Sequence, residues 1–118
     1  MLKEMLKEVD LPCLTDRVKR DLQILALQGM PEEVCGLLHR HGIIHQYQNV
    51  FVGDKSHGFD MFVVLDTDTV AIWHSHPGGL IKQSSDDVPV MEMLKSKMIS
   101  APWIIVTTHS VTAWTLDL

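Results

Sequence analysis

Several features that would assign a chain to a broad functional class are missing from this 118-residue sequence. It has no excess of positive charge, because 15 acidic residues outnumber 10 basic ones and the formal net charge is −5. Nucleic acids and anionic membranes are bound through basic surfaces, so neither is an expected partner. No apolar run approaches the roughly 18 residues that span a bilayer, and the amphipathic start lacks the apolar core of a secretory signal.

Cysteine is also scarce, and this bears on the cellular compartment. Cys13 and Cys35 do not have CxxC spacing. Two cysteines in a chain of this size, without a signal, do not indicate a disulfide scaffold. We therefore expect a reducing, cytoplasmic location. Cys35 lies in an apolar stretch, which favours a buried core residue over a nucleophile.

The whole chain, residues 1–118, is expected to form a single domain, since its length suffices for one hydrophobic core and no repeat or linker interrupts it. Residues 1–12 are expected to form an N-terminal arm or a short helix. Thr15 can cap a helix that begins at Asp16 and carries apolar residues at helical spacing. Gly29 and Pro31 end this helix.

The remaining sequence consists of β-rich runs separated by turns. We expect strands over 33–38, 43–52, 59–65, 70–76, 103–108 and 111–116. A loop over 80–85 and a helix over 86–98 separate the first four of these strands from the last two. This order predicts an α+β domain with a mixed, mostly antiparallel β-sheet flanked by helices.

The segment that suggests chemistry begins at the end of the strand expected over 70–76. Residues 74–79 read HSHPGG, and Ser84, Ser85, Asp86 and Asp87 follow. Two histidines at i and i+2 on a strand point to the same face, so His74 and His76 can bind one ion. A catalytic zinc takes three protein ligands and leaves a position for water. Asp86 or Asp87, at the start of the following helix, can supply the third ligand.

An HxH pair alone does not name a reaction, because such pairs occur as structural histidines and in other metal folds such as the cupins. A cupin-like site needs a glutamate a few residues after His76, but the next glutamate is Glu92, on the expected helix. The other histidines, His39, His41, His45, His57 and His109, are expected in exposed turns. A second metal is an alternative for His39, His41 and His45, which cluster around the first turn. Trp73 and Trp103 are expected to be core residues or the walls of a groove.

The spacing resembles the signature of the JAMM metallopeptidases, also called MPN+ or JAB. That signature is HxHP, six residues, Ser, two residues and Asp. In this register it aligns Ser84 and Asp87 rather than their neighbours. The family also carries an upstream glutamate in contexts such as PxExCGL. Residues 31–37 read PEEVCGL, which aligns Glu33 with that glutamate.

The resemblance implies a cytidine-deaminase-like MPN architecture and a zinc-dependent peptidase or isopeptidase. His74, His76 and Asp87 would hold one Zn²⁺, which would activate a water for hydrolysis of an amide bond. Glu33 would carry protons between the water and the leaving amine. Ser84 would donate a hydrogen bond to the oxyanion, in addition to or instead of capping the helix.

Two further stretches resemble JAMM domains that accompany phage tail proteins. They are AIWHSHP over 71–77 and APWIIV over 101–106. A peptide or protein substrate, phage tail proteins as partners and association with a virion are therefore expected. The chain has no room for the insertions with which some relatives grip ubiquitin, so specific cleavage of ubiquitin chains is not expected. The alternative function is a structural module that keeps its metal site without turnover.

Overall fold

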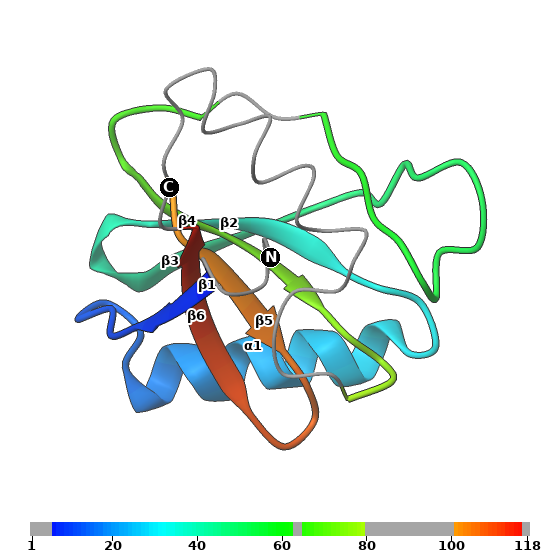
Figure 1. Ribbon diagram of the computed structural model, residues 1–118, viewed down its shortest axis with the longest axis horizontal. Helices are drawn as coiled ribbons and strands as arrows, with labels where there is room; N and C mark the ends of the chain where they lie inside the picture. The colour runs from blue at the N-terminus through cyan, green and yellow to red at the C-terminus, as the bar shows by residue number, and fades with distance from the viewer. Residues whose placement is uncertain (1–5, 63–64, 80–100, 117–118) are drawn as a thin grey trace.

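The computed structural model describes residues 6–62, 65–79 and 101–116 (Figure 1). The elements in chain order are β1 (Leu6–Val9), α1 (Asp16–Gly29), β2 (Cys35–His39), the short 3-10 turn η2 (Arg40–Gly42), β3 (Ile43–Tyr47), β4 (Thr69–Ser75), β5 (Trp103–Val106) and β6 (Val111–Leu116). The loop and helix expected over 80–98 lie outside the described residues.

The described strands form one sheet in the order β1-β6-β5-β4-β2-β3. Strands β4 and β5 are parallel, and the other neighbouring pairs are antiparallel. The expected α+β class and the mixed, mostly antiparallel sheet are therefore confirmed. Strand β4 lies between β2 and β5, so its main chain is hydrogen-bonded along both edges.

Helix α1 covers one face of this sheet (Figure 1). It begins where the sequence predicts, because the Thr15 hydroxyl accepts a hydrogen bond from the Val18 N–H at 3.3 Å. Its apolar face is buried against residues of β2, β4, β5 and β6. The buried residues of this core are Val18, Leu22, Ala26, Val34, Leu38, Ala71, Trp73, Ile104, Val106 and Ala113.

A second, smaller core occupies the opposite face of the sheet. It is formed by Leu37 of β2, Ile72 of β4 and Trp103 of β5. Side chains alternate between the two faces of a strand, so residue 74 of β4 projects on the same side as Ile72. The same alternation places Glu33 and Cys35 on the side of Leu37. The chemically interesting residues therefore share the face that α1 does not cover.

One glycine is required where β2, β3 and β4 meet. A Cβ atom on Gly36 would overlap the carbonyl group of His45 in β3 and lie 2.8 Å from Nε1 of Trp73 in β4. The absence of a side chain lets the Trp73 ring, which is fully buried, lie over β2.

The N-terminal arm contains a strand. Residues 6–9 pair antiparallel with β6, from Leu6 opposite Leu116 to Val9 opposite Ala113. The alternative of a short helix is therefore wrong for these residues. The physical reason is that β6 offers an unpaired edge, and pairing satisfies its backbone groups better than an isolated helical turn would.

The strand expected over 59–65 is wrong for residues 59–62 and 65, which the structure describes as loop. The strand expected over 43–52 ends at Tyr47. The backbone around Phe59 is bonded to Asn49 and Val50 instead of to a strand. The Asn49 amide bonds to the Gly58 carbonyl oxygen and the Asp60 N–H, and the Val50 N–H donates to the Asp60 carbonyl oxygen.

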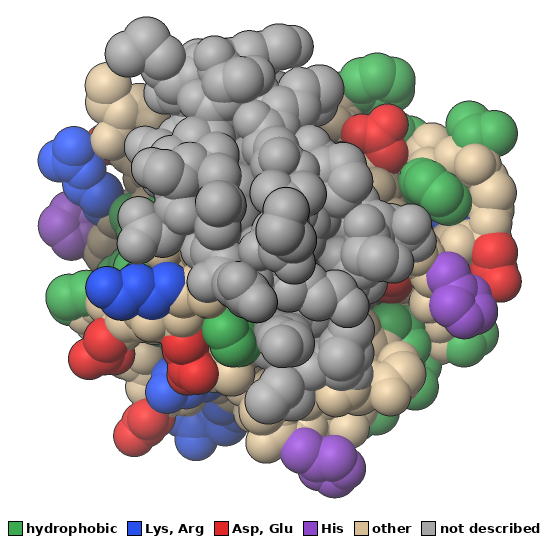
Figure 2. Space-filling model, viewed as in Figure 1, with side chains coloured by type: hydrophobic (Ala, Val, Ile, Leu, Met, Phe, Trp, Pro, Cys, Tyr) green, Lys and Arg blue, Asp and Glu red, His purple; other side chains and the backbone are tan. Residues whose placement is uncertain are grey.

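Residues 48–62 form a long loop, which lies on the right-hand side of Figure 1. Its exposed hydrophobic side chains include Val52 and Phe62, 96% and 85% exposed. Hydrophobic side chains are visible on the same side of Figure 2.

Candidate metal centre

The end of β4 fixes two histidines on the face opposite α1. His74 lies opposite Cys35 of β2 and Ile105 of β5. His76 follows the strand, and its N–H donates to the Val106 carbonyl oxygen at 2.9 Å. Both side chains are buried, with 0% and 7% exposure. The main chain of both residues is thus held by neighbouring strands, as the HxH spacing predicts.

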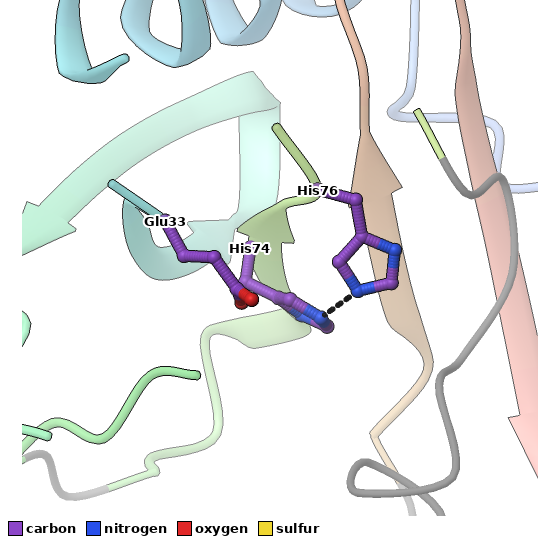
Figure 3. A group of neighbouring side chains, drawn as sticks. All are labelled: Glu33, His74 and His76. Atoms are coloured by element: carbon purple, nitrogen blue, oxygen red, sulfur yellow. Dashed lines mark hydrogen bonds between the residues drawn. The ribbon is translucent and has the colours of Figure 1, made fainter. Parts of the chain in front are cut away.

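The two imidazoles converge through their Nε2 atoms, which lie 2.9 Å apart (Figure 3). Their ring centroids are 4.7 Å apart at an interplanar angle of 68°. A tetrahedral zinc with Zn–N bonds of about 2.0–2.1 Å separates two ligand nitrogens by about 3.3 Å. A side-chain adjustment of a few tenths of an ångström would therefore let both nitrogens bind one ion.

Glu33 supplies a carboxylate beside these rings. It precedes β2, its side chain is 6% exposed, and it reaches toward His74 (Figure 3). One ligand atom from each of Glu33, His74 and His76 lies within 4.8 Å of the others, and the three could hold a metal ion. Within residues 6–62, 65–79 and 101–116, this is the group of metal-ligating side chains that the structure brings together.

The backbone of Glu33 is held by the long loop rather than by a strand. Its N–H donates to the Lys55 carbonyl oxygen at 2.7 Å. Its carbonyl oxygen accepts a hydrogen bond from Nδ2 of Asn49 at 2.9 Å. The N–H and the carbonyl oxygen of Glu33 therefore both have hydrogen-bond partners in residues 49–55. These bonds position the backbone from which the Glu33 carboxylate extends.

Aromatic rings enclose His74. Phe59 stacks on its imidazole with centroids 4.2 Å apart and an interplanar angle of 21°. Trp103 meets the same imidazole edge-on, with centroids 5.6 Å apart at 85°. These rings exclude water from the flanks of His74 and leave its Nε2 directed at His76. In such a low-dielectric surrounding, charges at the site interact more strongly than in water.

Cys35 lies beside the site without joining it. Burial, followed by the negative charges of Glu33 and Asp60, raises the pKa of its thiol to about 12. The thiol is therefore protonated at neutral pH. Its Sγ lies 3.9 Å from the Tyr47 carbonyl oxygen. The expectation that Cys35 is a buried core residue is confirmed.

The remaining histidines of the described chain differ in their exposure to solvent. His41, His45, His57 and His109 are exposed, as expected. His39 departs from the expectation, because it lies in β2 with its side chain 13% exposed and its ring 4.5 Å from that of His45. Among the described residues, these histidines form no group with metal-ligating geometry. Trp73 and Trp103 are buried at 0% and 2% exposure, as core residues.

Three residues of the predicted site lie outside the described residues: Ser84, Asp86 and Asp87. Their roles stay predictions. The sequence reasoning missed Asn49 and Phe59, which were both assigned to strands. The signal for Asn49 was its position shortly before a glycine-containing turn, where asparagine side chains commonly bond to the backbone.

Comparison with known proteins shows no matching family model and no match among curated proteins or solved structures. No helix among the described residues has the length and apolar character needed to cross a membrane. The features of this chain that bear on function are therefore the geometry of Glu33, His74 and His76 and the spacing of the motif that contains the two histidines.

Proposed function

We propose that this protein is a zinc-dependent hydrolase that cleaves an amide bond, in the manner of the JAMM peptidases that its motif resembles. The observation that carries the proposal is the buried group of Glu33, His74 and His76 within 4.8 Å. Two imidazoles and a carboxylate are ligands that suit zinc, whereas calcium and magnesium prefer sites composed of oxygen atoms. When bound, zinc would lower the pKa of a coordinated water to about 7.

Metal binding and proton transfer would be carried out by different residues of the chain. His74 and His76 would hold the ion through Nε2, and the motif register gives Asp87 as the third ligand. Glu33 would then accept a proton on a carboxylate oxygen and return it to the leaving amine. Ser84 would donate a hydrogen bond to the oxygen of the amide that is cleaved.

A peptide or protein is the proposed substrate. The loop that carries Phe59 against His74 also exposes Val52 and Phe62, and these exposed apolar side chains would offer contacts to an extended chain that reaches the site along the loop. Phage tail proteins are the proposed biological context, on the resemblance of residues 71–77 and 101–106 to tail-associated members.

The test is metal analysis combined with a peptidase screen of wild type and Glu33→Gln. Glu32→Gln is the matched control, because Glu32 is the exposed neighbour of Glu33. We expect one zinc per chain in all three proteins and a loss of turnover of about 10²–10⁴-fold in Glu33→Gln alone, the range for a general base. Absence of stoichiometric zinc from wild type would contradict the proposal.

The same variants separate the two roles open to Glu33. If Glu33 were the third ligand, Glu33→Gln would lose zinc as well as turnover. If Glu33 transfers protons, zinc stays bound and turnover is lost. Equal biological activity of Glu33→Gln with zinc bound would instead favour a structural module.

The register of the motif has its own test. Asp87→Ala should abolish zinc binding, and Asp86→Ala should largely spare it. The reverse result would show that the alignment of the signature is displaced by one residue.

A further inference from the structure

The amide of Asn49 makes hydrogen bonds to four backbone groups around the candidate site. Its Nδ2 donates to the carbonyl oxygens of Glu33 at 2.9 Å and of Gly58 at 3.0 Å. Its Oδ1 accepts from the N–H groups of Phe51 at 3.0 Å and of Asp60 at 3.1 Å. The two donors and the acceptor oxygen of this side chain are therefore all used.

This pattern determines how the amide is oriented. A flipped amide would direct its NH₂ group at the two N–H groups of Phe51 and Asp60. It would also direct its oxygen at the two carbonyl oxygens of Glu33 and Gly58. Both contacts would be repulsive, so the network admits one orientation.

The bonded residues include positions on both sides of Phe59. Asn49 binds the carbonyl oxygen of Gly58 and the N–H of Asp60, which precede and follow Phe59 in the chain. The Val50 N–H adds a bond to the Asp60 carbonyl oxygen at 2.8 Å. The backbone at Phe59 is thus tied to Asn49, and the Phe59 ring stacks on His74 at 4.2 Å.

We propose that Asn49 is a positioning residue that holds Glu33 and Phe59 against His74, so that one side chain sets both the carboxylate and the aromatic wall of the metal centre. Glu33 and Phe59 themselves lie outside the strands. The residue after Glu33 is held by β4, because the Ser75 N–H donates to the Val34 carbonyl oxygen at 2.8 Å. Asn49 adds support on the other side, where it binds the Glu33 carbonyl oxygen and the backbone groups that flank Phe59. The proposal rests on the proposed function only for its effect on zinc.

The variant that isolates this role is Asn49→Asp. It keeps the shape of the side chain but replaces two N–H donors with an oxygen that faces two carbonyl oxygens. Gln48→Glu is the matched control, because it makes the same change from amide to acid at the exposed preceding residue. Both proteins are compared with wild type as the full chain, first without metal.

Two NMR measurements report the geometry without any zinc. The stacked Phe59 ring should shift the His74 ring protons upfield, and the Glu33 amide should be protected from hydrogen exchange by its bond to Lys55. In Asn49→Asp we expect the upfield shift to be lost and the Glu33 amide to exchange at least tenfold faster. Gln48→Glu should match wild type in both. Unchanged His74 signals and unchanged Glu33 exchange in folded Asn49→Asp would overturn the proposal.

Zinc affinity, measured by competition with a chelator, gives the functional readout. Loss of a supporting group around a metal site typically costs about 10–100-fold in affinity, and we expect a loss of this size in Asn49→Asp alone. If wild type binds zinc and Asn49→Asp binds it equally well, the positioning role is refuted. If wild type binds no zinc, the proposed function fails, and the NMR measurements still decide the role of Asn49.

A second variant keeps the test decisive should Asn49→Asp fail to fold. Phe59→Leu removes the ring while leaving every Asn49 hydrogen bond in place. It should lose the His74 ring-current shift and retain slow exchange at Glu33. Fast exchange at Glu33 in wild type, or in Phe59→Leu, would show that the loop is not held as proposed.

Discussion

Zinc should stabilise this protein strongly against thermal unfolding. His74 and His76 lie at the end of β4, whereas Glu33 precedes β2, and the three side chains meet only when the sheet has formed. The unfolded chain offers no such group, so zinc would bind the native state preferentially and would shift the unfolding equilibrium by mass action. Removing the metal should therefore lower the melting temperature.

The size of the effect follows from the length of the chain. Free zinc at 100 times its Kd stabilises the native state by about 2.7 kcal/mol. Unfolding entropy near the melting temperature is about 2.1 cal/mol/K per residue, which for 118 residues gives about 0.25 kcal/mol per kelvin. The expected rise in Tm is then about 11 °C, well above the precision of a melting curve.

The assay is differential scanning calorimetry of chelator-treated protein with and without added zinc. His76→Ala should show almost no shift on adding zinc, because one of the two convergent nitrogens is gone. His109→Ala is the matched control, since His109 is exposed between β5 and β6, and should shift as wild type does. A wild-type Tm that does not respond to zinc, or a full response in His76→Ala, would refute the reasoning.

Other predictions concern the residues around the centre. Gly36→Ala should lower the free energy of unfolding by more than about 3 kcal/mol in urea denaturation, because the added methyl group would overlap the main chain of β3. Gly78→Ala is the control, because its Cβ would meet nothing within 4 Å, and it should change the free energy of unfolding by under about 0.5 kcal/mol. The pKa of Cys35 is raised to about 12, so its thiol should be alkylated at pH 8 only after the protein unfolds. The half-buried Cys13 should be alkylated in the native protein, and mass spectrometry would distinguish the two sites. Thr15→Ala should cost about 1 kcal/mol of unfolding free energy by removing the helix cap, and an unchanged denaturation midpoint would contradict this.

Local patterns in the sequence were sufficient to predict much of the fold. Helix α1 begins at the residue after Thr15 and ends at Gly29, since caps and helical spacing act within a few residues. Strand β6 was predicted with its full bounds, 111–116. The errors involve pairing between distant segments. Strand β1 forms because β6 leaves an edge free. Residues 59–62 stay out of the sheet, since the backbone of Gly58 and Asp60 is bonded to Asn49 and Val50 instead.

Local sequence patterns likewise predict some parts of the candidate site and not others. The convergence of His74 and His76 follows from the two-residue period of a strand, and the structure confirms it with an Nε2–Nε2 distance of 2.9 Å. The proximity of Glu33 was predicted from a resemblance to the motif of a known family, because no local rule brings residue 33 to residue 74. The place of Asn49 before a glycine-containing turn could indicate that it bonds to the backbone, but not that it binds Glu33, 16 residues away. The stacking of Phe59 on His74 has no local signal in the sequence.

The histidines and Glu33 differ in how their backbones are supported. The histidines project from the end of a strand paired on both edges, so they are preorganised before metal binds, and little ordering is required of them. The N–H and the carbonyl oxygen of Glu33 are bonded to the loop that Asn49 organises, whereas the next residue, Val34, is bonded to Ser75 of β4. We therefore expect a change in the loop to move the Glu33 carboxylate more than it moves the histidines. If the centre binds zinc as proposed, substitutions in residues 49–60 should alter metal affinity and proton transfer while leaving the sheet that carries the histidines unchanged.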